Sequence, residues 1–63
     1  MAIKNKDKYN LKNYYIETEK VGKMYEAYFK EVDTQEVICT KKSVWDMGAI
    51  NQILEWLEED AEE

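Results

Sequence analysis

Apolar and polar positions alternate along the first half of the chain, which is typical of β-strands. Tyr14, Ile16 and Thr18 fall on one face of an extended segment, and Tyr15, Glu17 and Glu19 fall on the other. A second run over residues 25–30 alternates in the same way, with Tyr25, Ala27 and Phe29 on its apolar face. Tyr, Val, Ile and Thr suit a pleated, half-buried surface. Each run therefore predicts one strand.

Short polar segments separate these runs and predict tight connections. Gly22 can adopt a positive φ between the first two strands. Asp33, Thr34 and Gln35 supply turn chemistry before a third short run over residues 37–40. Strands joined by short loops favour antiparallel pairing, so we expect a three-stranded meander over residues 9–42.

The period changes from two to 3.6 after Lys42, which indicates an amphipathic helix. Ser43 is a good N-cap residue, and Asp46 three positions later completes a capping box, so the helix is expected from there to about Glu59. Gly48 costs about 1 kcal/mol relative to Ala in a helix, which suggests close packing of the first turn against the sheet. The predicted core stripe consists of Met47, Ile50, Ile53, Leu54, Leu57 and Ala61.

These elements predict an α+β fold of the order β-β-β-α, with the helix on one face of the sheet. Residues 1–8 are polar and rich in lysine, and we expect them to form a mobile arm before a single domain over residues 9–59. Residues 60–63 are expected to form a frayed acidic tail, because carboxylates at a helix C-terminus face the negative end of the macrodipole.

The net charge of −5 is unevenly distributed over the 63 residues. Residues 1–12 hold four lysines and one aspartate, whereas residues 46–63 hold seven carboxylates and no basic side chain. A negative field repels nucleic-acid phosphates, and the chain contains no arginine for a bidentate contact to guanine. We therefore expect a protein partner with a basic surface rather than direct nucleic-acid binding.

The residue types that usually carry catalysis are scarce in this chain. It contains no histidine, so the commonest general base and zinc ligand are missing, and the single cysteine, Cys39, has no histidine to activate it. Ser43 is the only serine, and Gly22 and Gly48 are too far apart to form a phosphate-binding loop. We expect a non-enzymatic protein with no cofactor and no metal site.

The helix carries more apolar surface than one small sheet needs. Trp45, Ala49 and Trp56 lie on a second line beside the core stripe, and the remaining flank is acidic. Tryptophan is enriched at interface hot spots, and an acidic rim selects a basic partner, so we expect Trp56, beside its acidic neighbours, to lie at an interface. Both Trp side chains could instead complete the core, since Trp is usually largely buried. The candidate partner-binding residues are Trp45, Trp56, Glu55, Glu58 and Glu59.

Three functional hypotheses follow from these features. The first is a small acidic protein-binding module, in particular an inhibitor that mimics nucleic acid. In size and charge the chain is similar to phage and mobile-element proteins that block restriction, repair or CRISPR enzymes. The second is a structural homodimer or an assembly subunit that uses the Trp line or a sheet edge. The third is a single-stranded nucleic-acid binder that uses the tyrosines of the sheet.

The sequence also suggests a compartment. A single cysteine favours a reducing environment, the basic N-terminus is not followed by an apolar signal segment, and no apolar run is long enough to span a membrane. We expect a cytoplasmic protein that does not bind membranes.

Overall fold

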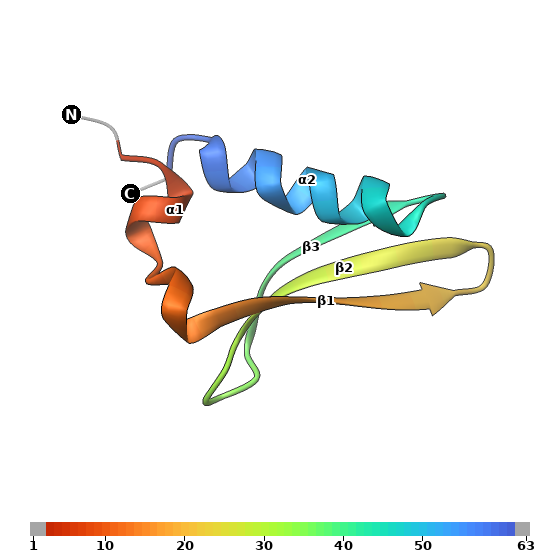
Figure 1. Cartoon of the computed structure of the whole chain (residues 1–63), viewed down its shortest axis with the longest axis horizontal. Helices are drawn as coiled ribbons and strands as arrows, with labels where there is room; N and C mark the ends of the chain where they lie inside the picture. Colours follow the sequence, from red (N-terminus) through yellow and green to blue (C-terminus); the bar gives the residue numbers. More distant parts are fainter. Residues whose placement is uncertain (1–2, 62–63) are drawn as a thin grey trace.

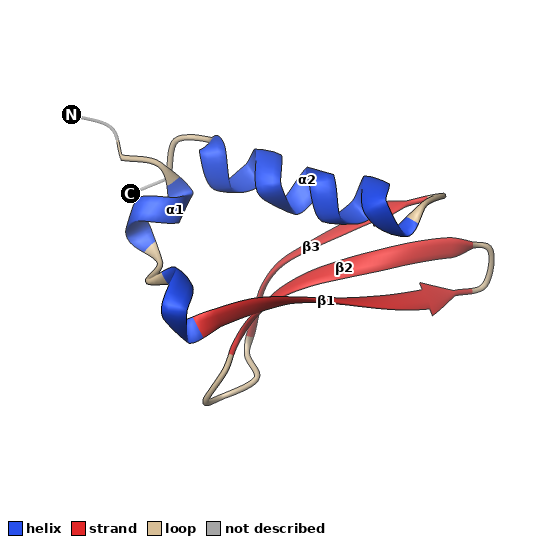
Figure 2. Cartoon of the chain, viewed as in Figure 1, coloured by secondary structure: helices blue, strands red, loops and turns tan. Residues whose placement is uncertain are grey.

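The computed structural model describes residues 3–61 and places one long helix beside a three-stranded sheet (Figure 1). The sheet is a consecutive antiparallel meander of the order β1-β2-β3 (Figure 2). The predicted β-β-β-α order and α+β class are confirmed. The elements in chain order are α1 (Asn5–Lys8), the 3-10 helix η1 (Leu11–Asn13), β1 (Tyr14–Val21), β2 (Met24–Glu31), β3 (Val37–Ser43) and α2 (Asp46–Glu58).

The core lies between α2 and one face of the sheet. β1 pairs with β2 over their whole lengths, so that Ile16 lies opposite Phe29 and Thr18 opposite Ala27. Side chains alternate between the two faces of a strand, so these four residues share the face that α2 covers. Among residues 3–61, the buried apolar residues are Ala27, Phe29, Ala49, Ile53 and Leu57.

β3 is longer than predicted and carries an irregularity. Its pairing with β2 continues to Ser43, which lies opposite Tyr25, because Lys41 and Lys42 extend the ladder. The register shifts between Phe29 and Lys30, where β3 has an extra residue. A β-bulge of this kind twists a strand locally and interrupts its edge.

The predicted capping box does not form. Ser43 ends β3, the N-cap position of α2 is Trp45, and no side chain caps the helix there. The Ser43 hydroxyl instead accepts a 3.3 Å bond from the backbone N–H of Trp45, and Asp46 accepts a 2.7 Å bond from Met47. Because the sheet ladder uses Ser43, the N-cap of the helix is Trp45, two residues later than the sequence pattern predicts.

Gly48 has the packing role that the sequence suggested. A Cβ atom at this position would collide with the Ser43 hydroxyl and press on its Cβ. The first turn of α2 therefore approaches the end of β3 as closely as only glycine allows.

The N-terminal residues are not a free arm in the described structure. The N–H of Asn5 donates to the carbonyl of Glu59 at 2.9 Å, and the N–H of Ala61 donates to Ile3 at 2.7 Å. Lys4 and Asp60 form an isolated antiparallel bridge. The two ends of the chain therefore pair with each other, and α1 lies beside the C-terminal end of α2 (Figure 1). The expectation of a mobile arm is wrong for residues 3–8, and that of a frayed tail is wrong for residues 60 and 61; Met1, Ala2, Glu62 and Glu63 lie outside the described residues.

The N-terminal segment docks here because the C-terminal end of α2 has unsatisfied backbone carbonyls. The last four carbonyls of a helix have no partner within it, and the acidic last turn makes this end unfavourable. Asn5 supplies donors to two of these carbonyls, and the ammonium groups of Lys4 and Lys6 bind Glu58 at 3.1 and 2.9 Å. The lysine-rich start of the chain thus compensates the acidic end of the helix.

Candidate functional site

The rotation of α2 about its axis determines which side chains reach solvent. Ala49, Ile53 and Leu57 face the sheet and are buried. Met47 and Leu54 were predicted to be core residues, but 59% and 48% of their surfaces are exposed. That prediction was wrong, because the core stripe is centred on Ile53 rather than between Ile53 and Leu54.

A contact with β3 explains this rotation. The side-chain amide of Gln52 donates a 2.8 Å hydrogen bond to the carbonyl of Lys42. Successive helical residues are about 100° apart, so Met47 and Leu54 lie roughly opposite Gln52. Since β3 and β1 are the two edges of the sheet, Met47 and Leu54 point to the β1 side.

This exposed surface combines apolar and acidic side chains. A shallow, open depression of about 460 Å³ is lined by Asn51, Leu54, Glu55 and Glu58. We call the surface of Met47, Asn51, Leu54, Glu55 and Glu58 the outer side of α2. No side chain of residues 3–61 covers it fully.

The two tryptophans have different environments. Trp45, at the start of α2, is 71% exposed. Trp56 is half-buried, and its ring lies 5.8 Å from that of Tyr9 and 5.7 Å from that of Phe29. Tyr14 stacks on Phe29 at 5.1 Å and completes an aromatic cluster that ties the N-terminal segment to the core. Of the pair, only Trp45 presents most of its surface to solvent, whereas the sequence favoured Trp56 as the interface residue.

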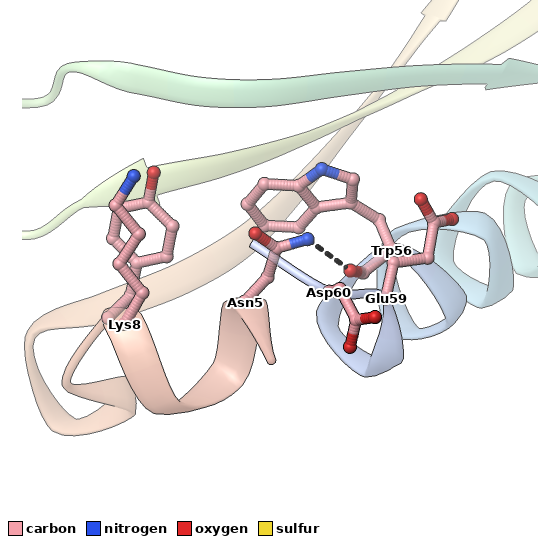
Figure 3. Close-up of a pocket in the computed structure, with 6 residues that line it drawn as sticks. Asn5, Lys8, Trp56, Glu59 and Asp60 are labelled. Carbon is pink, nitrogen blue, oxygen red and sulfur yellow. Dashed lines mark hydrogen bonds between the residues drawn. The ribbon is translucent and has the colours of Figure 1, made fainter. Parts of the chain in front are cut away.

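A second, more polar pocket of about 260 Å³ lies where the chain ends meet (Figure 3). Figure 3 shows the Asn5 side chain directed at the Trp56 carbonyl, to which it donates a 2.7 Å hydrogen bond. The Lys8 ammonium lies 5.7 Å from the centre of the Tyr9 ring, within cation–π range. The contacts here join the two ends of the chain, which is a structural role.

The candidate carboxylates differ in their partners. Glu58 binds Lys6 and Lys4, and these hydrogen bonds hold the pKa of its carboxyl below the ordinary value. Glu55 and Glu59 are exposed. Of the three predicted acidic residues, Glu58 therefore already has its charge balanced by lysines of the same chain.

The face of the sheet away from α2 carries a polar network. The Tyr28 hydroxyl lies 2.6 Å from a Glu26 oxygen and 3.1 Å from a Glu19 oxygen, and these hydrogen bonds raise the Tyr28 pKa. The Lys30 ammonium binds Glu17 at 3.3 Å and lies 5.8 Å from the Tyr15 ring. The Tyr15 hydroxyl donates a 2.5 Å hydrogen bond to the side-chain oxygen of Gln35. The hydroxyls of Tyr15 and Tyr28 on this face therefore both bond to other side chains of the chain.

Cys39 has the surroundings of a packing residue. It is half-buried against the core, and burial raises the pKa of its thiol despite the opposing effect of Lys41. The reactive thiolate form is therefore disfavoured. Within residues 3–61, no three His, Cys, Asp or Glu side chains are grouped so that they could hold a metal ion.

No helix in the described part of the chain has the length and apolar character needed to cross a membrane. Comparisons of the chain with models of protein families, with curated proteins and with solved structures found no match, so its function is argued from its own residues.

Proposed function

We propose that this chain is a non-enzymatic protein-binding module, and that the outer side of α2 is its interface. One observation carries the proposal: Met47 and Leu54 remain exposed on a helix whose opposite side already fills the core. Single exposed apolar residues are common on protein surfaces. Here, however, the two lie seven positions apart on one line of the helix, as they do in helices that dock on a partner.

The acidic neighbours define the kind of partner. Glu55 and Glu58 border Leu54. Lys4 and Lys6 already balance the charge of Glu58, so Glu55 supplies the acidic border. An apolar centre with an acidic border is complementary to a surface with an apolar patch and a basic rim, and the charges mainly increase the rate and specificity of association. Trp45, exposed at the start of α2, extends the apolar surface available to such a partner.

Nucleic-acid mimicry is a narrower form of this proposal. It requires carboxylates that are free to imitate phosphates, and Glu55 and Glu59 meet this condition better than Glu58, which binds two lysines. The inhibitor hypothesis, including a phage or mobile-element origin, therefore depends on Glu55 and Glu59. Replacing both by Gln, with Glu36→Gln as the control, should weaken a mimic's binding and flatten its dependence on salt.

The homodimer and the single-stranded nucleic-acid binder are less well supported. Like charge at Glu55 disfavours pairing of the outer side of α2 with a second copy of itself. The hydroxyls of Tyr15 and Tyr28 bond to other side chains, and Tyr14 packs in the aromatic cluster. A cytoplasmic location remains an inference from the single cysteine.

The proposal is tested by affinity capture from the native host with three matched proteins. The first is the wild type, the second carries Met47→Ser and Leu54→Ser, and the third carries Val37→Ser, which changes an apolar residue of β3 that is also exposed. All three should unfold at similar denaturant concentrations, because none of these residues belongs to the buried core. We expect a protein that the wild type and Val37→Ser retain and that the double variant loses. Equal retention by all three, or no specific protein, contradicts the proposal.

A further inference from the structure

The outer side of α2 lies next to the less protected edge of the sheet. β3 and β1 are both edge strands, but β3 contains the register shift and ends with Lys41, Lys42 and Ser43. Bulges and edge lysines are the usual means by which proteins prevent unwanted strand pairing. β1 pairs with β2 without interruption over eight residues and contains no proline, and its charged side chains are Glu17, Glu19 and a single lysine, Lys20. Among residues 3–61, no strand pairs with its other edge.

α2 does not fully cover the inner face of β1. The helix packs mainly against β3 and β2. Ile16 is only half-buried, and Thr18, on the same face, is exposed. Leu54 and Met47 project from the helix to this side. A further strand would lie about 4.8 Å beyond β1, beneath these two side chains.

From this arrangement we propose that β1 accepts an extended segment of the protein partner as a fourth strand, with apolar residues alternating with Lys or Arg. The apolar side chains would face Leu54, Met47 and Ile16, and the basic ones would face Glu17 and Glu19 on the open side of the sheet. Backbone hydrogen bonds supply affinity in such strand addition, and alternate side chains supply specificity. This inference rests on the proposed function, since it names what the outer side of α2 binds.

Charge on β1 disfavours a second copy of the chain as the fourth strand. The two symmetric antiparallel registers that pair most of β1 with itself are centred on Glu17 and on Thr18. They place Glu17 opposite Glu17 and Glu17 opposite Glu19, respectively. Like charges directly opposite each other destabilise a strand pair. The same two carboxylates favour a basic segment; a lysine of that segment would share Glu17 with Lys30 and Glu19 with the Tyr28 hydroxyl.

The probe for this site is a ten-residue peptide of alternating valine and lysine with both ends blocked. Added to the isotopically labelled full chain, it should shift the backbone amide signals of β1 and the methyl signals of Leu54 and Met47. Amides of β1 that do not bond to β2 should exchange more slowly with solvent. The double variant Glu17→Gln/Glu19→Gln should bind about fivefold more weakly, as expected for the loss of two exposed charge pairs.

Two matched peptides separate strand addition from general attraction. A valine–glutamate peptide should not bind, and a valine–lysine peptide with alternate backbone nitrogens methylated on its pairing edge should lose binding, because it cannot donate to β1. The inference is overturned if the methylated peptide binds as well as the parent, if the shifts centre on β3, or if the chain pairs with itself through β1 in sedimentation experiments.

The strand proposal and the proposed function can fail separately. If no peptide binds β1 but Met47→Ser/Leu54→Ser still abolishes capture of the host partner, only the fourth strand is wrong. If the peptide binds β1 but capture does not depend on Met47 and Leu54, the outer side of α2 is not the interface.

Discussion

The side-chain amide of Asn5 donates a 2.7 Å hydrogen bond to the carbonyl oxygen of Trp56, 51 positions further along the chain. Asn5 is 93% buried, since only 7% of its surface is exposed. The same Trp56 carbonyl also accepts the N–H of Glu59 at 3.1 Å. A residue near the start of the chain thus acts as the C-terminal cap of α2.

Replacing Asn5 by Ala should destabilise the fold by about 1–2 kcal/mol, because a buried hydrogen bond is lost and the end of α2 loses its cap. Chemical denaturation measures the change. Asn51→Ala is the matched control: it lies on the exposed side of the same helix and should change stability by no more than about 0.5 kcal/mol. Equal effects of the two substitutions would show that residues 3–8 are not docked as described.

Glu58 should couple this docking to pH. Hydrogen bonds from Lys6 and Lys4 lower its pKa from the ordinary value of 4.5. Because the pKa of Glu58 is lower in the folded than in the unfolded state, its ion pairs stabilise the fold fully when the pH is above the unfolded-state pKa. This stabilisation is lost as the pH falls through the folded-state pKa of Glu58. An NMR titration should therefore show the Asn5 amide signal moving together with the Glu58 carboxyl below pH 4.5. Glu58→Gln should abolish this transition of Asn5 and Glu55→Gln should preserve it; a transition that survives Glu58→Gln would contradict the assignment.

Gly48 and Ser43 should show a measurable coupling. An Ala in place of Gly usually stabilises a helix interior by about 1 kcal/mol. Gly48→Ala should give none of this gain, because its Cβ meets the Ser43 hydroxyl. In a Ser43→Ala background the hydroxyl is absent, so Gly48→Ala should cost less or become stabilising. A double-mutant cycle measures the difference, and strict additivity would mean that the two residues do not touch.

The two tryptophans should be distinguishable by fluorescence. Trp56→Phe leaves only Trp45, whose emission should resemble that of tryptophan in water and be readily quenched by acrylamide, because it is 71% exposed. Trp45→Phe leaves Trp56, which packs on Tyr9 and Phe29 and should emit at shorter wavelength with less quenching. Similar spectra for the two variants would place both tryptophans in one environment and contradict this assignment.

Sequence patterns predicted the sheet well, because its alternation is local. Ile16, Ala27 and Phe29 could be assigned to one face from a period of two alone. The rotation of α2 could not be predicted in the same way. The apolar side chains from Trp56 round to Met47 cover a wider arc of the helix than the sheet can bury, so the pattern alone fits several rotations. In the observed rotation, Ala49, Ile53 and Leu57 are buried and Gln52 bonds to Lys42.

The docking of the N-terminal segment could not be predicted, because its contacts join residues more than 50 positions apart, such as Lys6 and Glu58. The complementary charges of the two ends were visible in the sequence. Their pairing was not, since a lysine-rich start and an acidic end are equally compatible with two mobile tails.

Photo-crosslinking from Leu54 in the native host tests whether the outer side of α2 contacts a partner protein. A photoreactive phenylalanine analogue replaces Leu54 in one protein and the exposed Val37 of β3 in another. We predict a covalent adduct with one partner protein from position 54, absent from position 37 and lost when Met47→Ser is added. No adduct from position 54, or the same adducts from both positions, would contradict the assignment of the outer side of α2 as the binding surface.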